Sequence, residues 1–356
     1  VVTAPTLSTV TISKGAEAIT GTEQSGVWAI DVPEYGVWTV SATLGSITVT
    51  ETVSVDAVQQ YEVEIDYIDQ NLDGNDWNVI GAVGQVGTGA NYWSIGDTKT
   101  ITVSGTVGGQ TVSGSFDVFI IDFNYRGTNG IYFQGFKTQE GEDICLVDSH
   151  YGGNASAGSK WFNLNHWGSG STPYNTNYGG WKGCDARYDV LGSTNLPPSG
   201  YGATAVKARV GYNAESTTPT NPVENTLMAA LPSALRNVMA PWTIYTDNVG
   251  GSTAAAGNIT ASVDYLPLLD EFEIQGVRKY ANSYSENYQA QMAYYANGNE
   301  KTKKKHTATS TAAIWWCRGP RSGYSSAFCC VSSSGASITE NSRDAYGLAP
   351  AFRVAG

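Results

Sequence analysis

The chain has few of the residues on which most catalytic and metal sites depend. Its 356 residues include only three histidines, which are His150, His166 and His306. A serine or cysteine nucleophile would need one of these three as its base. The five cysteines are Cys145, Cys184, Cys317, Cys329 and Cys330. They contain no C-x-x-C pair, so their spacing indicates neither a zinc site nor a disulfide framework. We therefore expect no catalytic residues, no resident metal and no cofactor.

Positive charge and long apolar runs are also scarce. Lys and Arg number 20 against 32 Asp and Glu, which gives a net charge of −12. This balance argues against binding to nucleic acid, which favours a basic face, and against docking on anionic lipid. No apolar run approaches the length that spans a bilayer, so we expect no membrane insertion. The chain begins Val-Val-Thr-Ala-Pro, without an initiator Met or a signal peptide, and we interpret this start as a cut in a longer protein.

Alternating apolar residues dominate the first part of the chain. Short runs separated by turn residues predict a small antiparallel sandwich over residues 1–67. Segments 26–30 and 37–43 form its clearest strand pair, joined through Pro33 and Gly36. The sandwich resembles the carboxypeptidase-regulatory-like and Ig-like modules that act as spacers. We expect it to have a mechanical role.

A polar turn follows at residues 69–74, with the sequence Asp-Gln-Asn-Leu-Asp-Gly. It matches the start of a calcium loop, but the twelfth position is Ile80 where a bidentate Glu is needed. We favour a turn leading into an apolar element that buries Trp77, Ile80 and Val83. Calcium binding near this turn stays open as an alternative.

The middle of the chain mixes strands and helices. We expect strands at 96–103, 116–123, 131–136 and 143–147, a loop over 151–183, a helix capped by Asn221, a second helix after Pro232, and helices at 267–274 and 284–296. Tyr284 and Tyr288 in the last helix are expected to pack in the core, with a sugar-binding platform as the alternative. The basic run 301–306 is expected to be a solvated loop, with contact to an acidic partner as the alternative. Free thiols are favoured over a vicinal disulfide at Cys329 and Cys330.

The C-terminal segment, residues 314–354, alternates two kinds of residue. The expected core residues are Ile314, Trp315, Phe328, Val331, Leu348, Pro350, Phe352 and Val354. Between them stand mostly Ser, Gly, Tyr, Arg, Asn, Asp and Thr. Tyrosine supplies rigid contact area, and small polar residues supply adaptable hydrogen bonding. This composition is typical of a binding surface held up by a fixed core.

These residues resemble the C-type-lectin fold, in which a Trp-Trp-x-Arg-Ser-Pro-like strand and a closing Gly-x-x-Pro-Ala-Phe-Arg-Val strand enclose a polar face. The matching residues are 315–320 and 347–354, together with 96–99, 179–181, Arg187 and the helices at 222–239. The same ending resembles the variable proteins of diversity-generating retroelements. The resemblance implies a mainly β chain, with the sandwich followed by an α+β domain over residues 68–356. That domain would have the lectin fold shared by formylglycine-generating enzymes.

Residue usage in the segment fits that resemblance. In those retroelements reverse transcription randomises adenines, and randomised Asn codons cannot yield Lys, Glu, Gln, Trp or Met. These five types make up 50 of the 356 residues but only one of the 30 residues 317–346, which is Glu340. Gly319 departs from the family's usual Ser, and we interpret it as a varied position.

The resemblance implies a non-enzymatic ligand-binding protein on a phage tail or a bacterial surface. Its partner would be a host cell-surface protein or glycan, and several copies would assemble, for example as a trimer. The expected ligand-binding residues are Arg318, Arg321, Ser322, Tyr324, Ser325, Ser332, Ser333, Ser334, Thr339, Asn341, Ser342, Arg343, Asp344 and Tyr346. Alternatives are a bacterial adhesin, a structural virion component and a formylglycine-generating oxidase. The adjacent Cys329 and Cys330, without a supporting acid and base, make the oxidase the least favoured.

Overall fold

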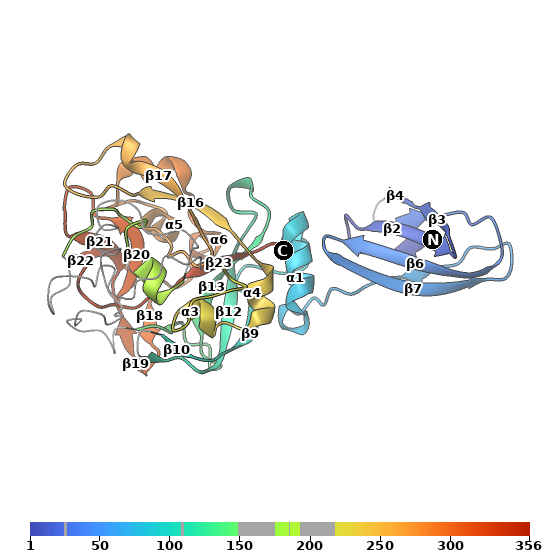
Figure 1. Ribbon diagram of the computed structural model, residues 1–356, viewed down its shortest axis with the longest axis horizontal. Coiled ribbons are helices and arrows are strands. Elements are labelled where there is room, and N and C mark those ends of the chain that lie inside the picture. Colours follow the sequence, from blue (N-terminus) through green and yellow to red (C-terminus); the bar gives the residue numbers. More distant parts are fainter. Residues whose placement is uncertain (25–26, 108–109, 149–174, 185, 193–217) are drawn as a thin grey trace.

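Two bodies of unequal size make up the molecule. The computed structural model describes residues 1–24, 27–107, 110–148, 175–184, 186–192 and 218–356. Strands dominate and the helices are short, so the expected mainly β class is confirmed. One buried apolar cluster draws on residues 2–65, and a much larger one on residues 44–354. Figure 1 shows the two bodies end to end, with helix α1 (Trp77–Val86) between them.

The smaller body consists of two four-stranded sheets. The first has the order β4 (Thr22–Gln24), β5 (Val27–Ala29), β1 (Val2–Thr3) and β8 (Val63–Glu64), and the second β3 (Glu17–Thr20), β2 (Thr9–Lys14), β6 (Gly36–Leu44) and β7 (Ile47–Val55). The pairing expected between segments 26–30 and 37–43 is therefore wrong, because β5 and β6 lie in different sheets. The chain crosses from one sheet to the other so that Trp28 and Trp38 can both be buried in the core.

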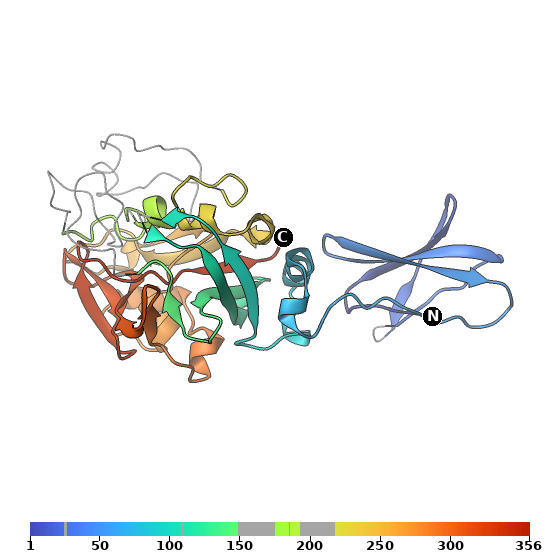
Figure 2. The same cartoon turned by 90° about the horizontal axis from the view of Figure 1, so that it is seen from below.

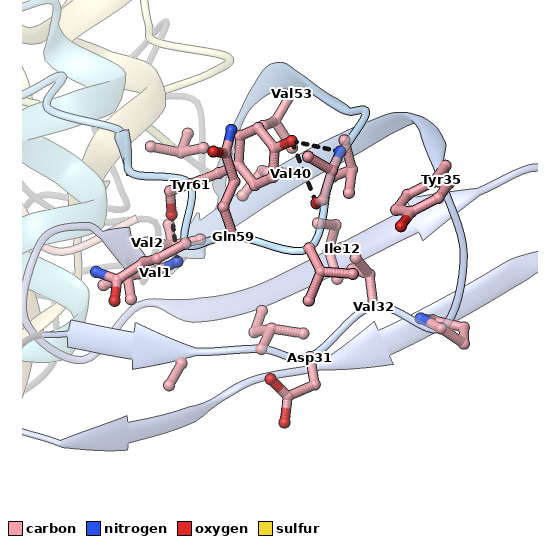
Figure 3. A pocket seen from close by; sticks show the side chains of 18 of the residues that line it. Val1, Val2, Ile12, Asp31, Val32, Tyr35, Val40, Val53, Gln59 and Tyr61 are labelled. Carbon is pink, nitrogen blue, oxygen red and sulfur yellow. Dashed lines mark hydrogen bonds between the residues drawn. The ribbon is translucent and has the colours of Figure 1, made fainter.

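The sheets of this body do not fill the space between them. A cavity of about 770 Å³ is lined mainly by aliphatic side chains, among them Ile12, Val32, Val40 and Val53 (Figure 3). At its rim the hydroxyl of Tyr61 donates to the Asp56 carboxylate and accepts the backbone N–H groups of Asp56 and Ala57. The small body therefore has this cavity beside a buried apolar cluster that includes Trp28, Trp38 and Val40.

Helix α1 packs against both bodies. Leu44, at the tip of the β6–β7 hairpin, is fully buried in the larger core. A Cβ on the neighbouring Gly45 would lie 3.1 Å from the backbone of Ala82, so the hairpin tip rests directly on the helix. On the other side, a Cβ on Gly84 would lie 2.3 Å from the carbonyl oxygen of Val354. Glycine is required here because helix and C-terminal strand approach so closely.

The turn before α1 uses its own polar side chains. Asp69 accepts the backbone N–H of Asn71 at 2.8 Å, and Asp73 accepts that of Thr100 at 2.8 Å. The turn leads into α1, which buries Trp77, Ile80 and Val83, so this prediction is confirmed. Among the described residues no group of three or more His, Cys, Asp or Glu side chains is placed to hold a metal ion.

An antiparallel five-stranded sheet is the centre of the larger body. Its order is β15 (Met239–Ala240), β23 (Ala351–Val354), β13 (Ile131–Lys137), β12 (Gly114–Phe123) and β9 (Thr98–Val103). The closing strand β23 therefore inserts beside β13, more than 200 residues earlier in the chain. Figure 2 shows this sheet beside α1.

Smaller sheets and short helices surround this centre. The sheets are β20 (Trp315–Pro320), β21 (Ala327–Val331) and β22 (Ser337–Asn341); β14 (Ile144–Cys145), β18 (Lys303–Lys305) and β19 (Ala308–Ala313); β16 (Trp242–Asp247) with β17 (Ile259–Asp264); and β10 (Thr106–Val107) with β11 (Gln110–Thr111). The α-helices are α3 (Leu227–Ala230), α4 (Ser233–Val238), α5 (Glu271–Gln275) and α6 (Ala293–Ala296). Short helices of other types lie at Leu72–Gly74, Gly89–Asn91, Tyr125–Gly127, Ala186–Val190, Ala256–Asn258 and Ser283–Tyr288.

Several helix boundaries differ from expectation. The first helix begins at Leu227 rather than Pro222, because Asn225 has a φ of 60° and Thr226 is the N-cap. α5 begins after Asp270, in a capping box with Glu273. The helix expected over 284–296 is wrong. The segment forms two short helices, Ser283–Tyr288 and Ala293–Ala296. They are separate because Gln289 is extended and its side chain donates to the Tyr245 carbonyl and the Asp270 carboxylate.

The expectations for the tyrosines of that segment and for the basic run are also corrected. Tyr284 and Tyr288 are 44% and 42% exposed, so they are not core residues. Residues 303–305 form strand β18, not a solvated loop. Lys303 is fully buried because its ammonium pairs with Asp143 at 2.6 Å and lies over the ring of Trp315.

Three remaining expectations have separate outcomes. All five cysteines are buried free thiols, which confirms that interpretation. His150, His166 and most of the expected loop 151–183 lie outside the described residues. Of the helices that the structure describes, none has the length and apolarity needed to cross a bilayer.

Candidate functional site

The sheet β20–β21–β22 is a buried frame with exposed connections. Strands β20 and β21 are buried along their whole length, and β22 is half-buried. The expected core residues Trp315, Phe328, Val331, Leu348, Pro350, Phe352 and Val354 are buried, and Ile314 is half-buried. Exposed residues are concentrated in the connections 321–326 and 332–336 and in residues 343–346.

Arg321 is the centre of the first connection. Its guanidinium carbon lies 3.3 Å from the centre of the Tyr324 ring and 5.7 Å from that of Tyr280. Its Nη1 donates to the Thr339 hydroxyl at 3.1 Å. A cation over aromatic rings is attracted to their electron-rich faces, so the three side chains stabilise one another. Tyr324 is still 49% exposed and is available for contact.

A buried asparagine holds this connection in place. The side-chain amide of Asn177 donates to the carbonyl groups of Tyr324 at 2.7 Å and Ala327 at 2.8 Å. Its backbone N–H donates to the Ser325 carbonyl, and its Oδ1 accepts the N–H of Gly251. Asn177 is fully buried, and each buried backbone group it satisfies would be costly to leave unpaired.

Glu271 holds the neighbouring segment that carries Tyr280. One carboxylate oxygen accepts the backbone N–H groups of Lys279, Tyr280 and Ala281, at 2.8–3.0 Å. The other accepts the hydroxyl of Ser337 on β22. Residues 279–281 and β22 are therefore joined through one carboxylate, and Ala281 also bridges to Arg321.

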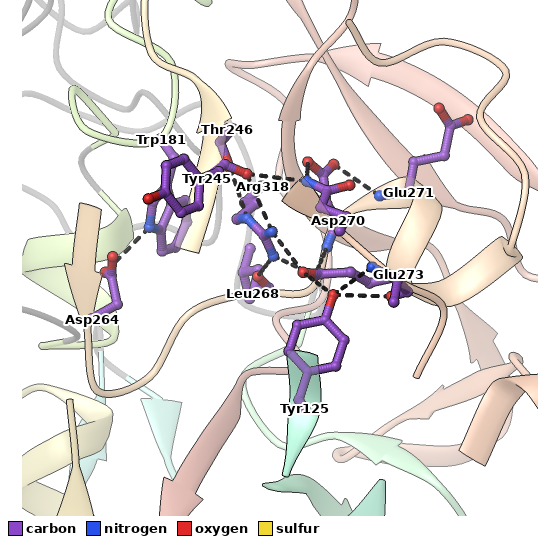
Figure 4. A network of polar contacts seen from close by, with 12 residues as sticks. Tyr125, Trp181, Tyr245, Thr246, Asp264, Leu268, Asp270, Glu271, Glu273 and Arg318 are labelled. Atoms are coloured by element: carbon purple, nitrogen blue, oxygen red, sulfur yellow. Dashed lines mark hydrogen bonds and ion pairs between the residues drawn. The ribbon is translucent and has the colours of Figure 1, made fainter. Parts of the chain in front are cut away.

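Arg318 lies beneath this surface and not on it. It is 0% exposed and pairs with Glu273 at 2.5 and 2.8 Å (Figure 4). It also donates to the Leu268 carbonyl and the Thr246 hydroxyl. The prediction that Arg318 contacts a ligand is wrong, because every direction in which its guanidinium donates is occupied by the protein interior. Its role in this structure is to hold β20 against α5.

The other predicted contacts do not form one surface. Ser322, Tyr324 and Ser325 lie with Arg321, while Asn341, Arg343 and Asp344 follow at the same end of the β21–β22 hairpin, where Ala327 pairs with Asn341. Ser332, Ser333 and Ser334 form the turn at the other end of the hairpin. The two ends are separated by the length of β21, which for five residues is roughly 13 Å. Ser342 is fully buried, so its predicted ligand contact is wrong.

Tyr346 lies on the opposite face of β22. The centre of its ring lies 5.2 Å from that of Trp316. Burial and the nearby negative charge of Glu340 both raise the pKa of its hydroxyl. Thr339 and Glu340 are neighbours on β22, so their side chains point to opposite faces of the sheet. Arg321 contacts Thr339 and Tyr346 lies near Glu340, which places Arg321 and Tyr346 on opposite faces. We call the group Arg321, Tyr324, Tyr280 and Thr339 the arginine–tyrosine surface. Tyr346 is outside it.

The interpretation of Gly319 as a varied position is corrected by its surroundings. A Cβ at this residue would lie 2.3 Å from Oδ1 of Asp270. That carboxylate is held by the backbone N–H of Glu271 and the side chain of Gln289. Because the neighbour is fixed, a larger residue at position 319 must displace the buried network.

The residues that sequence reasoning missed are Tyr280, Lys279, Glu271 and Asn177. They stand 40 or more residues before Arg321, on elements whose approach depends on the fold. One signal was present: Asp270 and Glu273 have capping-box spacing at the start of α5. It marks the helix start but says nothing of the segment that Glu271 holds.

The buried thiols have little chemical reactivity. Burial raises the pKa of Cys317, Cys329 and Cys330 well above the ordinary thiol value. The nucleophile in cysteine chemistry is the thiolate, so these side chains remain protonated and weakly reactive.

A family comparison covers this part of the chain. Residues 171–356 match the family model described as a domain of unknown function, DUF6273. The chain belongs to the DUF6273 family. The DUF6273 region contains Asn177, α5 and the sheet β20–β21–β22, hence the whole arginine–tyrosine surface. It leaves out the sandwich and strands β9, β12 and β13. No curated protein and no solved structure matches the chain.

Proposed function

We propose that this protein binds a ligand, without catalysis, through the arginine–tyrosine surface. The observation that carries the proposal is the position of Arg321 over the exposed ring of Tyr324, on a connection held by buried Asn177. Tyr and Arg are the residues that most often dominate binding energy at interfaces. A held loop also loses less conformational freedom when a ligand binds.

The proposal extends to the fold and the setting of the molecule. The larger body would be a C-type-lectin-like domain over residues 68–356, related to the variable proteins of diversity-generating retroelements, and residues 1–67 would be an Ig-like spacer. Buried strands flanking exposed connections support this view, because exposed residues can change at little cost in stability. The chain would be displayed on a phage tail or a bacterial surface and bind a host surface protein or glycan, as an oligomer such as a trimer.

An oxidase of the formylglycine-generating type is the alternative that the geometry favours least. Such chemistry needs a reactive thiolate, and the three thiols near this site are buried with raised pKa values. A purified chain that oxidised a cysteine-containing peptide would overturn the non-enzymatic proposal.

Cell binding tests the proposal directly. We expect the purified chain to bind a subset of a panel of intact bacteria, and Tyr324→Ala to lose that binding with little change in melting temperature. Tyr35→Ala is the matched control, because Tyr35 is 57% exposed but lies in the sandwich. Equal binding by Tyr324→Ala and the wild type would overturn the assigned surface. A gene locus with a reverse transcriptase and a near-identical template repeat would support the retroelement origin over a purely structural virion role.

A further inference from the structure

Two cationic side chains converge on one tyrosine ring of the arginine–tyrosine surface. Nζ of Lys279 lies 5.0 Å from the centre of the Tyr280 ring, and the guanidinium carbon of Arg321 lies 5.7 Å from it. Lys279 is exposed and Arg321 half-buried. Among the described residues neither forms an ion pair with a carboxylate, although the chain is acidic and nearby Arg278 pairs with Glu286 at 2.8 Å. Both positive charges lie near the Tyr280 ring without a carboxylate partner among these residues, so the electrostatic potential there favours an anionic ligand.

The geometry of Arg321 indicates which kind of anion. Its flat face is covered by the Tyr324 ring at 3.3 Å, so its N–H donors point outward in the guanidinium plane. One donor is taken by the Thr339 hydroxyl. The donors that remain suit a planar carboxylate, which accepts two parallel hydrogen bonds from one guanidinium.

The neighbouring rings favour a sugar as the carrier of that carboxylate. Arg321 covers one face of Tyr324, yet this residue stays 49% exposed, so another part of its ring is open. The apolar face of a pyranose can pack on a tyrosine ring while its hydroxyl groups and the phenol remain in water. The connection around it, with Gly323 and Ser325 exposed, is an open surface, whereas extended peptides are usually bound along a groove or strand edge.

We propose that Arg321 binds the carboxylate of an acidic sugar in the ligand, while Lys279, which contacts the same Tyr280 ring, adds positive charge to the site. This inference rests on the proposed function and names its ligand class. Glu271 and Ser337 act as positioning residues, because they hold segment 279–281 in the place where Lys279 reaches Tyr280. The site therefore joins a residue of the variable-looking region to residues of α5 and of the segment that follows it.

Binding to defined polymers tests the inference. We expect the intact chain to bind immobilised polygalacturonate and to bind its carboxyl-reduced form far less. Binding to polygalacturonate should weaken as the salt concentration rises. Arg321→Gln should reduce the affinity about ten- to hundred-fold, the usual effect of losing hydrogen bonds to a charged group. Arg321→Lys should restore only part of the affinity, since a lysine keeps the charge but loses the planar donors. Lys305→Gln is the control, because it removes one positive charge on β18, which belongs to a different sheet from β20–β21–β22. Circular dichroism and melting temperature establish that each variant is folded.

The outcomes separate this inference from the proposed function. Equal binding to the carboxyl-reduced polymer, or equal affinity of Arg321→Gln and Lys305→Gln, would overturn the carboxylate assignment. Binding to polyglutamate in place of polygalacturonate would overturn the assignment of a sugar as the ligand. If the chain binds intact bacteria in a Tyr324-dependent way but ignores polygalacturonate, the inference fails and the proposed function stands. If it binds neither, both fail.

Discussion

Arg318 and Glu273 form a two-pronged ion pair that is sealed from solvent, with Nη1–Oε2 and Nη2–Oε1 distances of 2.5 and 2.8 Å. The pair joins β20 to α5, and Tyr125 donates to the same Glu273 carboxylate at 3.2 Å. The arginine–tyrosine surface is built directly on these two elements. Its shape therefore depends on a buried charge pair that no ligand touches.

Removing one member of this pair should destabilise the fold strongly. We expect Arg318→Met to lower the free energy of unfolding by about 3–5 kcal/mol, because Glu273 is left as an unpaired buried charge. Urea unfolding measures the loss. The double variant Arg318→Met, Glu273→Leu should recover only part of it, because the Glu273 charge is removed but the buried Asp270 carboxylate still loses the nearby charge of Arg318. A single variant as stable as the wild type would contradict the assignment of Arg318 as a framework residue.

Glu271 should control binding without touching the ligand. Replacing it by Gln puts an amide group where the carboxylate accepts backbone N–H groups, so we expect a loss of about 1–3 kcal/mol in stability. Binding to bacteria should fall as well, because a neutral amide oxygen holds the three N–H groups of segment 279–281 less strongly than the carboxylate does. The control is Glu224→Gln, an exposed glutamate before α3. If both variants bind equally well, Glu271 has no positioning role.

Position 319 should accept only glycine. Gly319→Ser would place a Cβ against the Asp270 carboxylate, and overpacking of this kind costs about 1–3 kcal/mol. Differential scanning calorimetry should show a lower melting temperature. Ser325→Ala, on the exposed connection, should change stability by less than about 0.5 kcal/mol. An unchanged melting temperature for Gly319→Ser would restore this position as a varied one.

His306 should make stability depend on pH. Burial against Phe116 lowers the pKa of this imidazole below its usual 6.5. As pH falls below about 6.5 the unfolded chain binds a proton that the folded chain does not, so stability is lost until the pH reaches the folded pKa. Urea unfolding at several pH values between 7.5 and 5 should therefore show a smaller decline for His306→Gln than for the wild type. Parallel curves would show that His306 does not contribute.

Local patterns were enough for the elements whose residues contact their near neighbours. The apolar runs at 116–123 and 131–136 predict strands, and β12 and β13 pair there as a hairpin with both faces largely buried. The apolar spacing of Trp77, Ile80 and Val83 likewise marks the buried face of α1. Such local patterns report whether an element is buried and, where apolar residues recur with the period of the helix, which of its sides is buried.

Pairing between distant elements could not be predicted in the same way. Nothing in segments 26–30 and 37–43 indicates that they belong to different sheets, and both have the pattern of strands with one buried side. The basic run 301–306 is similar: its sequence indicates solvent exposure, but Asp143 and two aromatic rings make burial of Lys303 favourable. Partners remote in sequence decided both cases.

The sequence by itself determined that the chain is mainly β, that its C-terminal segment alternates core and polar residues, and that its thiols stay free. Only the tertiary structure decided which arginine lies at the proposed binding surface and which holds the buried framework together. Arg318 and Arg321 are three residues apart and chemically identical. One faces Glu273 in the interior and the other Tyr324 at the surface, because burial of a charge is favourable only where the fold supplies its partner.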